Sequence, residues 1–220
     1  MNRAEFIKTF SVFGATSVLP LEQLFGKPHT RKLHLIGLGD AGTGMIKYCS
    51  EKNNSLQYTI INTHFKEKYN AGFQFVEFDR PSNAYLENNQ ALKKVNIETV
   101  KKNNSLPQNI APFFSDKSKH YVLFSSLGGF TGSYLTLQLS KQLQKRGLKY
   151  TTIVNIPPYI MSPFRRTAAL TIKEELNTID NIHFFDSENL RSLYGNYRMK
   201  DQYTLANKEL YKIFKVKACT

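Results

Sequence analysis

The chain has 220 residues, 41% of them hydrophobic and 21% charged, which excludes a disordered, collagen-like or low-complexity protein. Thirty Lys and Arg against 17 Asp and Glu give a formal net charge of +13, which attracts phosphates, nucleic acid, anionic lipid or an acidic partner without choosing among them. A lysine-rich solvated surface explains the same charge. The two cysteines, Cys49 and Cys219, form no C-x-x-C pair, which favours a reducing compartment, and a cytoplasmic location is expected.

Residues 1–30 are expected to form an amphipathic helical extension ahead of one main domain, residues 31–220. Asn2 followed by Glu5 is close to a capping box. Three phenylalanines at helical spacing share one face: Phe6, Phe10 and Phe13. The apolar stretch 10–19 resembles an export signal only loosely and is too short and too polar to span a bilayer of about 30 Å. We therefore expect no transmembrane segment, with attachment to a membrane surface as the alternative.

From residue 32 onward, short apolar runs alternate with amphipathic stretches. Strands are predicted at residues 33–36, 58–61, 73–78, 121–124, 151–156 and 182–185. Helices are predicted at residues 43–51, 82–104, 132–146, 162–177 and 201–214. Strands separated by helices predict an α/β, Rossmann-like fold, in which a parallel sheet carries helices on both faces and ligands bind beyond the carboxyl ends of the strands.

A first glycine-rich turn follows the first predicted strand and opens a helix: Gly37-Leu38-Gly39-Asp40-Ala41-Gly42-Thr43-Gly44. Bare backbone amides at a helix N-terminus can receive phosphate oxygens. Taken literally the turn is a G-x-G-x-x-G dinucleotide fingerprint, but Asn62, Thr63 and His64 stand where an acidic residue should hold the ribose. A nicotinamide or flavin enzyme therefore ranks last among the hypotheses. A tight turn without any ligand is the structural alternative.

A second glycine-rich turn again lies between a predicted strand and a helix: Leu127-Gly128-Gly129-Phe130-Thr131-Gly132-Ser133. Two such turns in one domain suggest one polyphosphate held between two helix N-termini. Gly-Gly-x-Thr-Gly-Ser resembles the G-G-G-T-G-[ST]-G signature of the tubulin/FtsZ superfamily of GTP-binding cytoskeletal proteins. The first turn resembles the first nucleotide loop of that family.

The resemblance covers about residues 32–214, which implies the family's nucleotide-binding domain. Asn62 and Thr63 stand where FtsZ proteins carry N-T-D, and residues 151–166 resemble the strand and loop that end in a basic cluster near the phosphates, which points to Arg166 with Arg165 beside it. The segment from Asp201 to Asn207 resembles D-A-F-G-A-A-N at the start of the central helix.

By this resemblance Tyr203 stacks on guanine and Asn207 gives base specificity. The two residues are four apart, hence on one face of a helix, where an aromatic ring can cover a purine while an amide pairs with its edge. An ordinary core aromatic and a surface amide are the alternative.

The resemblance implies GTP or GDP as the ligand, with Mg²⁺ as a companion that no sequence motif supports. The scattered histidines have no metal-ligand spacing, so no metal ligand and no catalytic residue is assigned. The residues assigned to the nucleotide are Gly37, Gly39, Asp40, Ala41, Gly42, Thr43, Gly44, Asn62, Gly128, Gly129, Phe130, Thr131, Gly132, Ser133, Arg166, Asp201, Tyr203 and Asn207.

The sequence also departs from the family pattern. Phe130 replaces the third glycine of the signature and places a bulky side chain where backbone should approach phosphate. We therefore expect a narrower phosphate site at this turn and a reduced affinity for the nucleotide. Residues 73–104 contain no counterpart of the family's glycine-rich loop near the terminal phosphate, so discrimination of GTP from GDP has no support. Ser162 stands where FtsZ proteins have a ribose-binding Glu, and Gly44 where they have an Asn, so contacts to sugar and base are expected to be fewer.

In the family, the central helix leads to a loop whose acidic residues reach the nucleotide of the next subunit and orient the attacking water. This sequence ends at Thr220, directly after that helix, so weak or no hydrolysis is expected of the chain alone. The favoured hypothesis is a truncated FtsZ-like guanine-nucleotide-binding protein that acts with a protein partner, a filament-forming family member or further copies of itself, in cell division or DNA segregation. The alternative is a degenerate scaffold that binds protein or nucleic acid without nucleotide.

Overall fold

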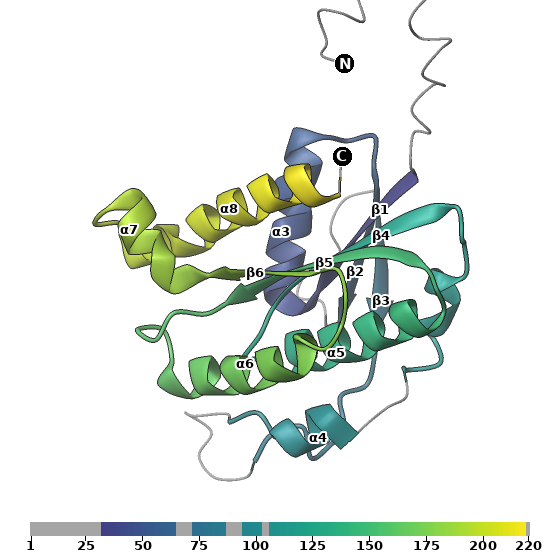
Figure 1. Ribbon diagram of the computed structural model, residues 1–220, viewed down its shortest axis with the longest axis horizontal. Coiled ribbons are helices and arrows are strands. Elements are labelled where there is room, and N and C mark those ends of the chain that lie inside the picture. Colours follow the sequence, from purple (N-terminus) through teal and green to yellow (C-terminus); the bar gives the residue numbers. More distant parts are fainter. Residues whose placement is uncertain (1–31, 65–71, 87–93, 103–105, 219–220) are drawn as a thin grey trace, which may run out of the picture. The chain divides into compact units, whose positions relative to one another are not determined.

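The computed structural model describes residues 32–64, 72–86, 94–102 and 106–218. The predicted N-terminal helix lies outside these residues. The described part contains one six-stranded sheet, all of it parallel, in the order β3-β2-β1-β4-β5-β6 (Figure 1). Its strands are β1 (Lys32–Leu38), β2 (Gln57–Asn62), β3 (Phe73–Glu77), β4 (Lys119–Ser126), β5 (Lys149–Ile156) and β6 (Ile182–Asp186). The predicted α/β fold with a parallel sheet is therefore confirmed.

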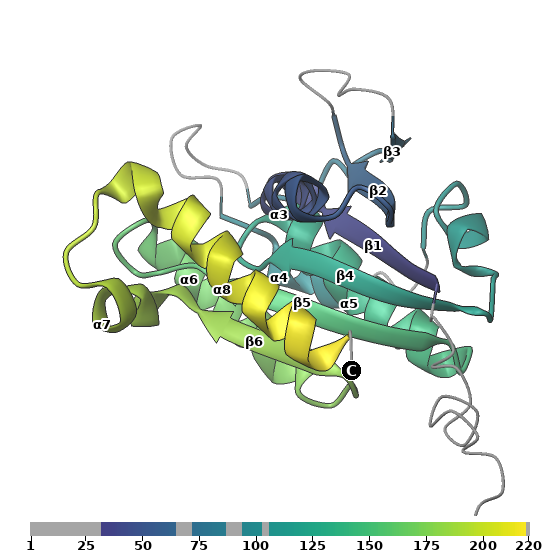
Figure 2. The ribbon, with the colours of Figure 1, turned by 90° about the horizontal axis from the view of Figure 1, so that it is seen from above.

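Helices cover both faces of this sheet (Figures 1 and 2). The helices are α3 (Gly39–Lys52), α4 (Ile97–Lys102), α5 (Phe130–Lys145), α6 (Pro163–Leu176), α7 (Leu190–Tyr194) and α8 (Gln202–Lys217), with short 3₁₀ turns at Ala111–Phe114, Ser187–Asn189 and Met199–Asp201. Helices α3 and α8 pack on one face and α5 and α6 on the other, and α4 packs against α5 and α6 on the side away from the sheet. No helix within the described ranges is long and apolar enough to cross a membrane.

The two faces of the sheet belong to separate apolar cores, because neighbouring side chains on a strand point to opposite sides. On β1, Leu35 belongs to the core under α3 and α8, whereas Ile36 and Leu38 belong to the core over α5 and α6. Phe214 of α8 meets Phe124 of β4 edge to face, with ring centroids 5.8 Å apart. Burial on both sides explains why the strands read as continuous apolar runs in the sequence.

Strands β1 and β4 lie side by side in the middle of the sheet, but the chain leaves them toward opposite faces. Residues 32–37 of β1 pair with residues 119–124 of β4. After β1 the chain enters α3 on one face, and after β4 it enters α5 on the other. Such a change of direction opens a crevice at the carboxyl ends of the two strands, where ligands bind in sheets of this kind.

The long helix predicted at residues 82–104 is wrong over the described residues. Tyr85 forms an antiparallel bridge with Val95, and only Ile97–Lys102 are helical. The stretch is rich in helix-forming residues but lacks a continuous apolar stripe, and a helix of this kind depends on tertiary packing. Here Ala84, Val95 and Val100 reach the core separately instead.

Candidate nucleotide site

A cavity of about 600 Å³ lies at the carboxyl ends of the strands, a volume within the usual range for small-molecule sites. Its walls come from the starts of α3, α5 and α8 and from the segments that follow β2, β3, β5 and β6. The cavity therefore sits where the sheet topology places a ligand.

The two glycine-rich turns meet inside this cavity. Gly39 has a φ of +69°, and a Cβ built on it would lie 3.4 Å from the backbone nitrogen of Gly132 and from the Cβ of Thr131. Among the described residues, no side chain caps α3 at Leu38 or α5 at Gly129. Two helix N-termini with uncapped amide groups thus lie next to each other, an arrangement that favours an anion.

Several glycines of the two turns serve the packing of the turns themselves. A Cβ on Gly37 would lie 2.4 Å from the carbonyl oxygen of Gly42, and one on Gly132 would lie 2.2 Å from the carbonyl oxygen of Ser126. Gly128 has a φ of +88° and would meet the carbonyl of Arg165 at 2.4 Å. No larger residue fits these positions without a shift of the backbone.

Gly129 is different, because it borders the cavity and a Cβ on it would meet no heavy atom of the described residues within 4 Å. Its backbone angles, φ −103° and ψ 153°, are open to any residue. The absence of a side chain at this position leaves space for a ligand and is not required by the fold.

The structure brings most of the sequence-predicted residues to the cavity wall: Gly39, Asp40, Ala41, Gly44, Asn62, Gly129, Phe130, Thr131, Gly132, Tyr203 and Asn207. It places the others outside that wall: Gly37, Gly42, Thr43, Gly128, Ser133, Arg166 and Asp201. Thr43 and Ser133 brace the turns, since the Thr43 hydroxyl donates to the Gly39 carbonyl (2.9 Å) and the Ser133 Oγ accepts from the Gly128 N–H (3.1 Å). Asp201 pairs with Arg198, Nε to Oδ2, at 2.8 Å.

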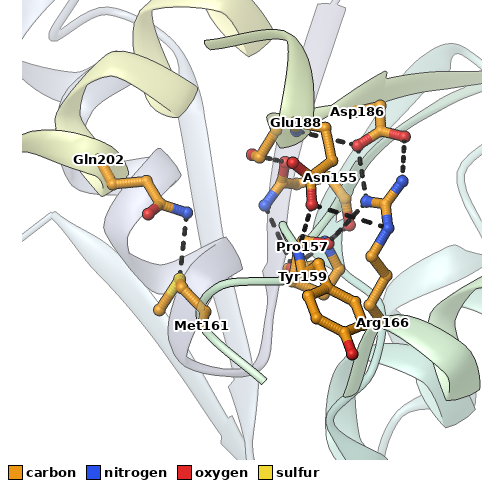
Figure 3. Close-up of polar contacts among 10 residues, drawn as sticks. Asn155, Pro157, Tyr159, Met161, Arg166, Asp186, Glu188 and Gln202 are labelled. Atoms are coloured by element: carbon orange, nitrogen blue, oxygen red, sulfur yellow. Dashed lines mark hydrogen bonds and ion pairs between the residues drawn. The ribbon is translucent and has the colours of Figure 1, made fainter. Parts of the chain in front are cut away.

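Arg166, predicted at the phosphates, points instead to the end of β6 (Figure 3). Its guanidinium donates to both carboxylate oxygens of Asp186 at 2.8 Å and to the Pro157 carbonyl at 2.9 Å. Although burial works to raise the pKa of Asp186, hydrogen bonds from Arg166 and from the backbone N–H of Glu188 hold that pKa below its ordinary value. Arg166 therefore fixes the loop between β5 and α6, and its neighbour Arg165 borders the cavity.

The prediction that the Phe130 side chain narrows the space for phosphate at the second glycine-rich turn is wrong. Its side chain is fully buried and stacks on Tyr134, with ring centroids 5.3 Å apart and nearly parallel planes. Tyr85 packs against the same ring at 6.3 Å. The bulk of Phe130 thus enters the core, and a cavity of about 600 Å³ remains beside it.

The opposite end of the cavity is formed by the first turns of α8. Tyr203 is 53% exposed, and Asn207 lies over α3, where a Cβ on Gly44 would be 3.7 Å from Asn207 Nδ2. Gln202 is buried, and its Nε2 donates to Met161 Sδ at 3.1 Å (Figure 3). The Gln202 Oε1 is buried and finds no hydrogen-bond partner among the described residues.

Sequence reasoning missed a polar floor at the ends of three strands. Asn155 at the end of β5 accepts from the Ser187 hydroxyl at 2.6 Å and donates to the Ser126 hydroxyl at 3.3 Å. All three residues border the cavity. Polar residues at the carboxyl ends of apolar strands were the available signal.

The charges around the cavity favour an anion. Arg80 and Arg165 border it, and the Arg80 guanidinium lies 4.9 Å from the centre of the Tyr85 ring. Asp40 is the one carboxylate among the described residues of the wall, and it accepts from Asn62 Nδ2 at 2.8 Å. Uncapped amides, two arginines and an unpartnered acceptor are together suited to a ligand with phosphates at one end and hydrogen-bond donors at the other.

No protein-family model and no curated protein sequence matches this chain. Its structure is similar to FtsZ from M. jannaschii, solved as an empty dimer, with a TM-score of 0.66 and 19% identity over 93% of this chain and 59% of that one. It is also similar to CetZ2 from Haloferax volcanii in a GTPγS-bound protofilament (TM-score 0.61, 14% identity, 84% and 57% of the chains).

A third similar structure is the phage tubulin PhuZ with GDP (TM-score 0.57, 18% identity, 84% and 55% of the chains). At these identities the likeness establishes the fold, and the chain spans less than two thirds of the length of these structures.

Proposed function

We propose that this chain, which has the fold of FtsZ, CetZ2 and PhuZ, binds a guanine nucleotide in the cavity at the carboxyl ends of its strands. The observation that carries the proposal is the meeting of two uncapped helix N-termini, with Tyr203 and Asn207 at the other end of the same cavity. Two of the similar structures contain guanine nucleotides, GTPγS in CetZ2 and GDP in PhuZ, which supports this class of ligand.

The phosphates would lie on the first turns of α3 and α5. Backbone amides at residues 39–41 and 130–132 supply donors, and Arg80 and Arg165 supply positive charge. Asp40, on the first turn of α3, is the carboxylate that would hold a Mg²⁺ ion carried by the phosphates.

The base would lie against α8. Tyr203 offers an exposed ring for stacking, and the amide of Asn207 carries both a donor and an acceptor for the edge of guanine. Adenine presents the opposite donor and acceptor pattern on that edge, so an Asn207 amide turned to pair with guanine would not match ATP.

Binding rather than rapid hydrolysis is the activity proposed for the isolated chain. Hydrolysis needs a group that orients the attacking water, and the described wall offers one carboxylate, Asp40, which is assigned above to Mg²⁺. A protein partner or a second copy of the chain would supply the missing group at the open face of the cavity.

Calorimetric titration with GTP, GDP and ATP tests the proposal. We expect binding of GTP and GDP, weaker binding of ATP, and roughly 10- to 100-fold weaker binding of GTP to Asn207→Ala, because one or two hydrogen bonds to the base are lost. Asn196→Ala is the matched control, since Asn196 is exposed and does not border the cavity. Absence of binding and of any thermal shift at millimolar GTP would contradict the proposal and favour a scaffold that binds protein or nucleic acid through its basic surface.

A further inference from the structure

We infer that Gln202 recognises the ribose of the nucleotide. Its side-chain carbonyl Oε1 accepts a hydrogen bond from a ribose hydroxyl, so the cavity prefers ribonucleotides to deoxyribonucleotides. This inference rests on the proposed binding of a guanine nucleotide. Gln202 occupies the place of an alanine in the motif that the start of α8 resembles, so the residue is a feature of this chain.

Gln202 is a polar residue at the head of an apolar stripe. It is 2% exposed, and the buried residues that follow it at four-residue intervals on α8 are Ala206, Leu210 and Phe214. These three fill the core between α8 and the sheet. An amide at such a position carries a desolvation penalty that packing alone does not relieve.

The orientation of the amide follows from its neighbour. Met161 Sδ, 3.1 Å from Gln202 Nε2, can accept a hydrogen bond but cannot donate one (Figure 3). The nitrogen therefore faces the sulfur, and the oxygen is the end of the amide that lacks a partner among the described residues. A buried acceptor without a donor beside a cavity indicates a group that arrives with the ligand.

The ligand offers few groups that can serve as this donor. Phosphate oxygens are acceptors, and the helix N-termini and arginines at the other end of the cavity suit them. The donors of the guanine edge are assigned to Asn207, five residues further along α8 and so about 7.5 Å along the helix axis. The ribose hydroxyls are the donors that remain, and Gln202 borders the cavity into which the sugar would fit.

Ser162 is already used by the protein. Its Oγ accepts from the backbone N–H of Arg165 at 3.3 Å and caps α6. Ser162 also lies on the cavity wall beside Met161. Of the Ser162 and Gln202 side chains, Gln202 is the one whose acceptor has no partner among the described residues.

The test compares GTP, 2′-deoxy-GTP and 3′-deoxy-GTP by calorimetry on the full chain. We expect at least one deoxynucleotide to bind about tenfold more weakly than GTP. In Gln202→Leu, which is close in size and has no acceptor, the ratio should fall to about one through weaker binding of GTP. Gln202→Glu keeps an acceptor and should keep a preference for GTP.

Gln57→Leu is the matched control, because Gln57 is exposed at the start of β2, the opposite end of the strands from the cavity, and its ratio should equal that of the wild type. Equal binding of all three nucleotides to the wild type would overturn the inference without any variant, and so would an unchanged ratio in Gln202→Leu. In both cases GTP still binds, so the proposed function stands. If the wild type binds no guanine nucleotide, the proposed function fails and the inference fails with it.

Discussion

The two ends of the cavity are built from different parts of the chain. At the end where α3 and α5 begin, the wall is mostly the backbone of the two glycine turns, in which Gly37, Gly128 and Gly132 leave no space for a Cβ. At the end formed by α8 and the loop after β5, the wall is made of side chains, among them Met161, Gln202, Tyr203 and Asn207.

This difference separates positions that determine whether the domain folds from positions that determine what it binds. A side chain added to a packed glycine meets main-chain atoms that cannot move independently, so the cost appears as lost stability. A side chain changed at the α8 end alters a hydrogen bond or a stacking surface, so the cost appears mainly in affinity. The predictions below test this division, from the largest expected effect to the smallest.

The largest effect is expected for Gly132→Ala. The new methyl group would lie 2.2 Å from the carbonyl oxygen of Ser126, and the backbone of β4 or α5 must shift, so the free energy of unfolding should fall by about 3 kcal/mol or more. Urea unfolding followed by circular dichroism measures this change. A variant as stable as the wild type would show that the two turns are not packed as the structure has them.

Arg166→Ala should have the next largest effect, and it tests the end of the cavity formed by α8 and the loop after β5. The substitution leaves Asp186 without its two-pronged partner and frees the Pro157 carbonyl, so a loss of about 2 kcal/mol of stability is expected. Arg165→Ala is the control, with little change in stability and weaker nucleotide binding that depends on salt. If Arg166→Ala unfolds no more easily but binds GTP far more weakly, Arg166 contacts the phosphates after all.

The same ion pair predicts a dependence of stability on pH. Because the pKa of Asp186 is lower in the folded chain than in the unfolded one, its contribution is present above the unfolded value of about 3.9 and is lost as the pH falls through the folded value. The difference in unfolding free energy between the wild type and Asp186→Asn should therefore shrink as the pH is lowered from 6 to 3. A difference that stays constant over this range would contradict the role assigned to the pair.

Gly129→Ala should produce the smallest change in stability, and its effect should appear in binding. The methyl group meets no heavy atom of the described residues within 4 Å and enters the space proposed for phosphate, so we expect about tenfold weaker binding of GTP with a melting temperature near that of the wild type. Gly129 lies three residues before Gly132 in the same turn, so the two variants compare an open position with a packed one. Unaltered affinity would place the phosphates away from α5.

The end of the cavity where α3 and α5 begin could be predicted from the sequence, because glycine patterns indicate local backbone geometry. The parallel sheet and the meeting of the two turns at the carboxyl ends of its strands follow from alternating strands and helices. The end formed by α8 and the loop after β5 could not be predicted in the same way, because its wall is made of side chains. Whether Arg165 or Arg166 enters the cavity depends on the start of α6 and on Asp186, a residue that lies 20 positions further along the chain.

The structure around Phe130 shows the same limit. A bulky residue in a glycine signature predicts obstruction, but its side chain stacks on Tyr134, one turn further along α5, and against Tyr85, which only the tertiary fold brings to this ring. The predicted helix at residues 82–104 failed for a related reason, because the bridge between Tyr85 and Val95 is a contact that no local pattern encodes.

The central claim is that one phosphate chain is held jointly by the backbone amides of both turns. Amide nuclear magnetic resonance of the labelled chain, titrated with GTP and with GMP, tests it directly. The account predicts that the N–H signals of residues 39–41 and 130–132 shift together with GTP and shift less with GMP, while those at the start of β2 remain in place. Shifts confined to one turn, or equal shifts with GMP, would contradict the claim.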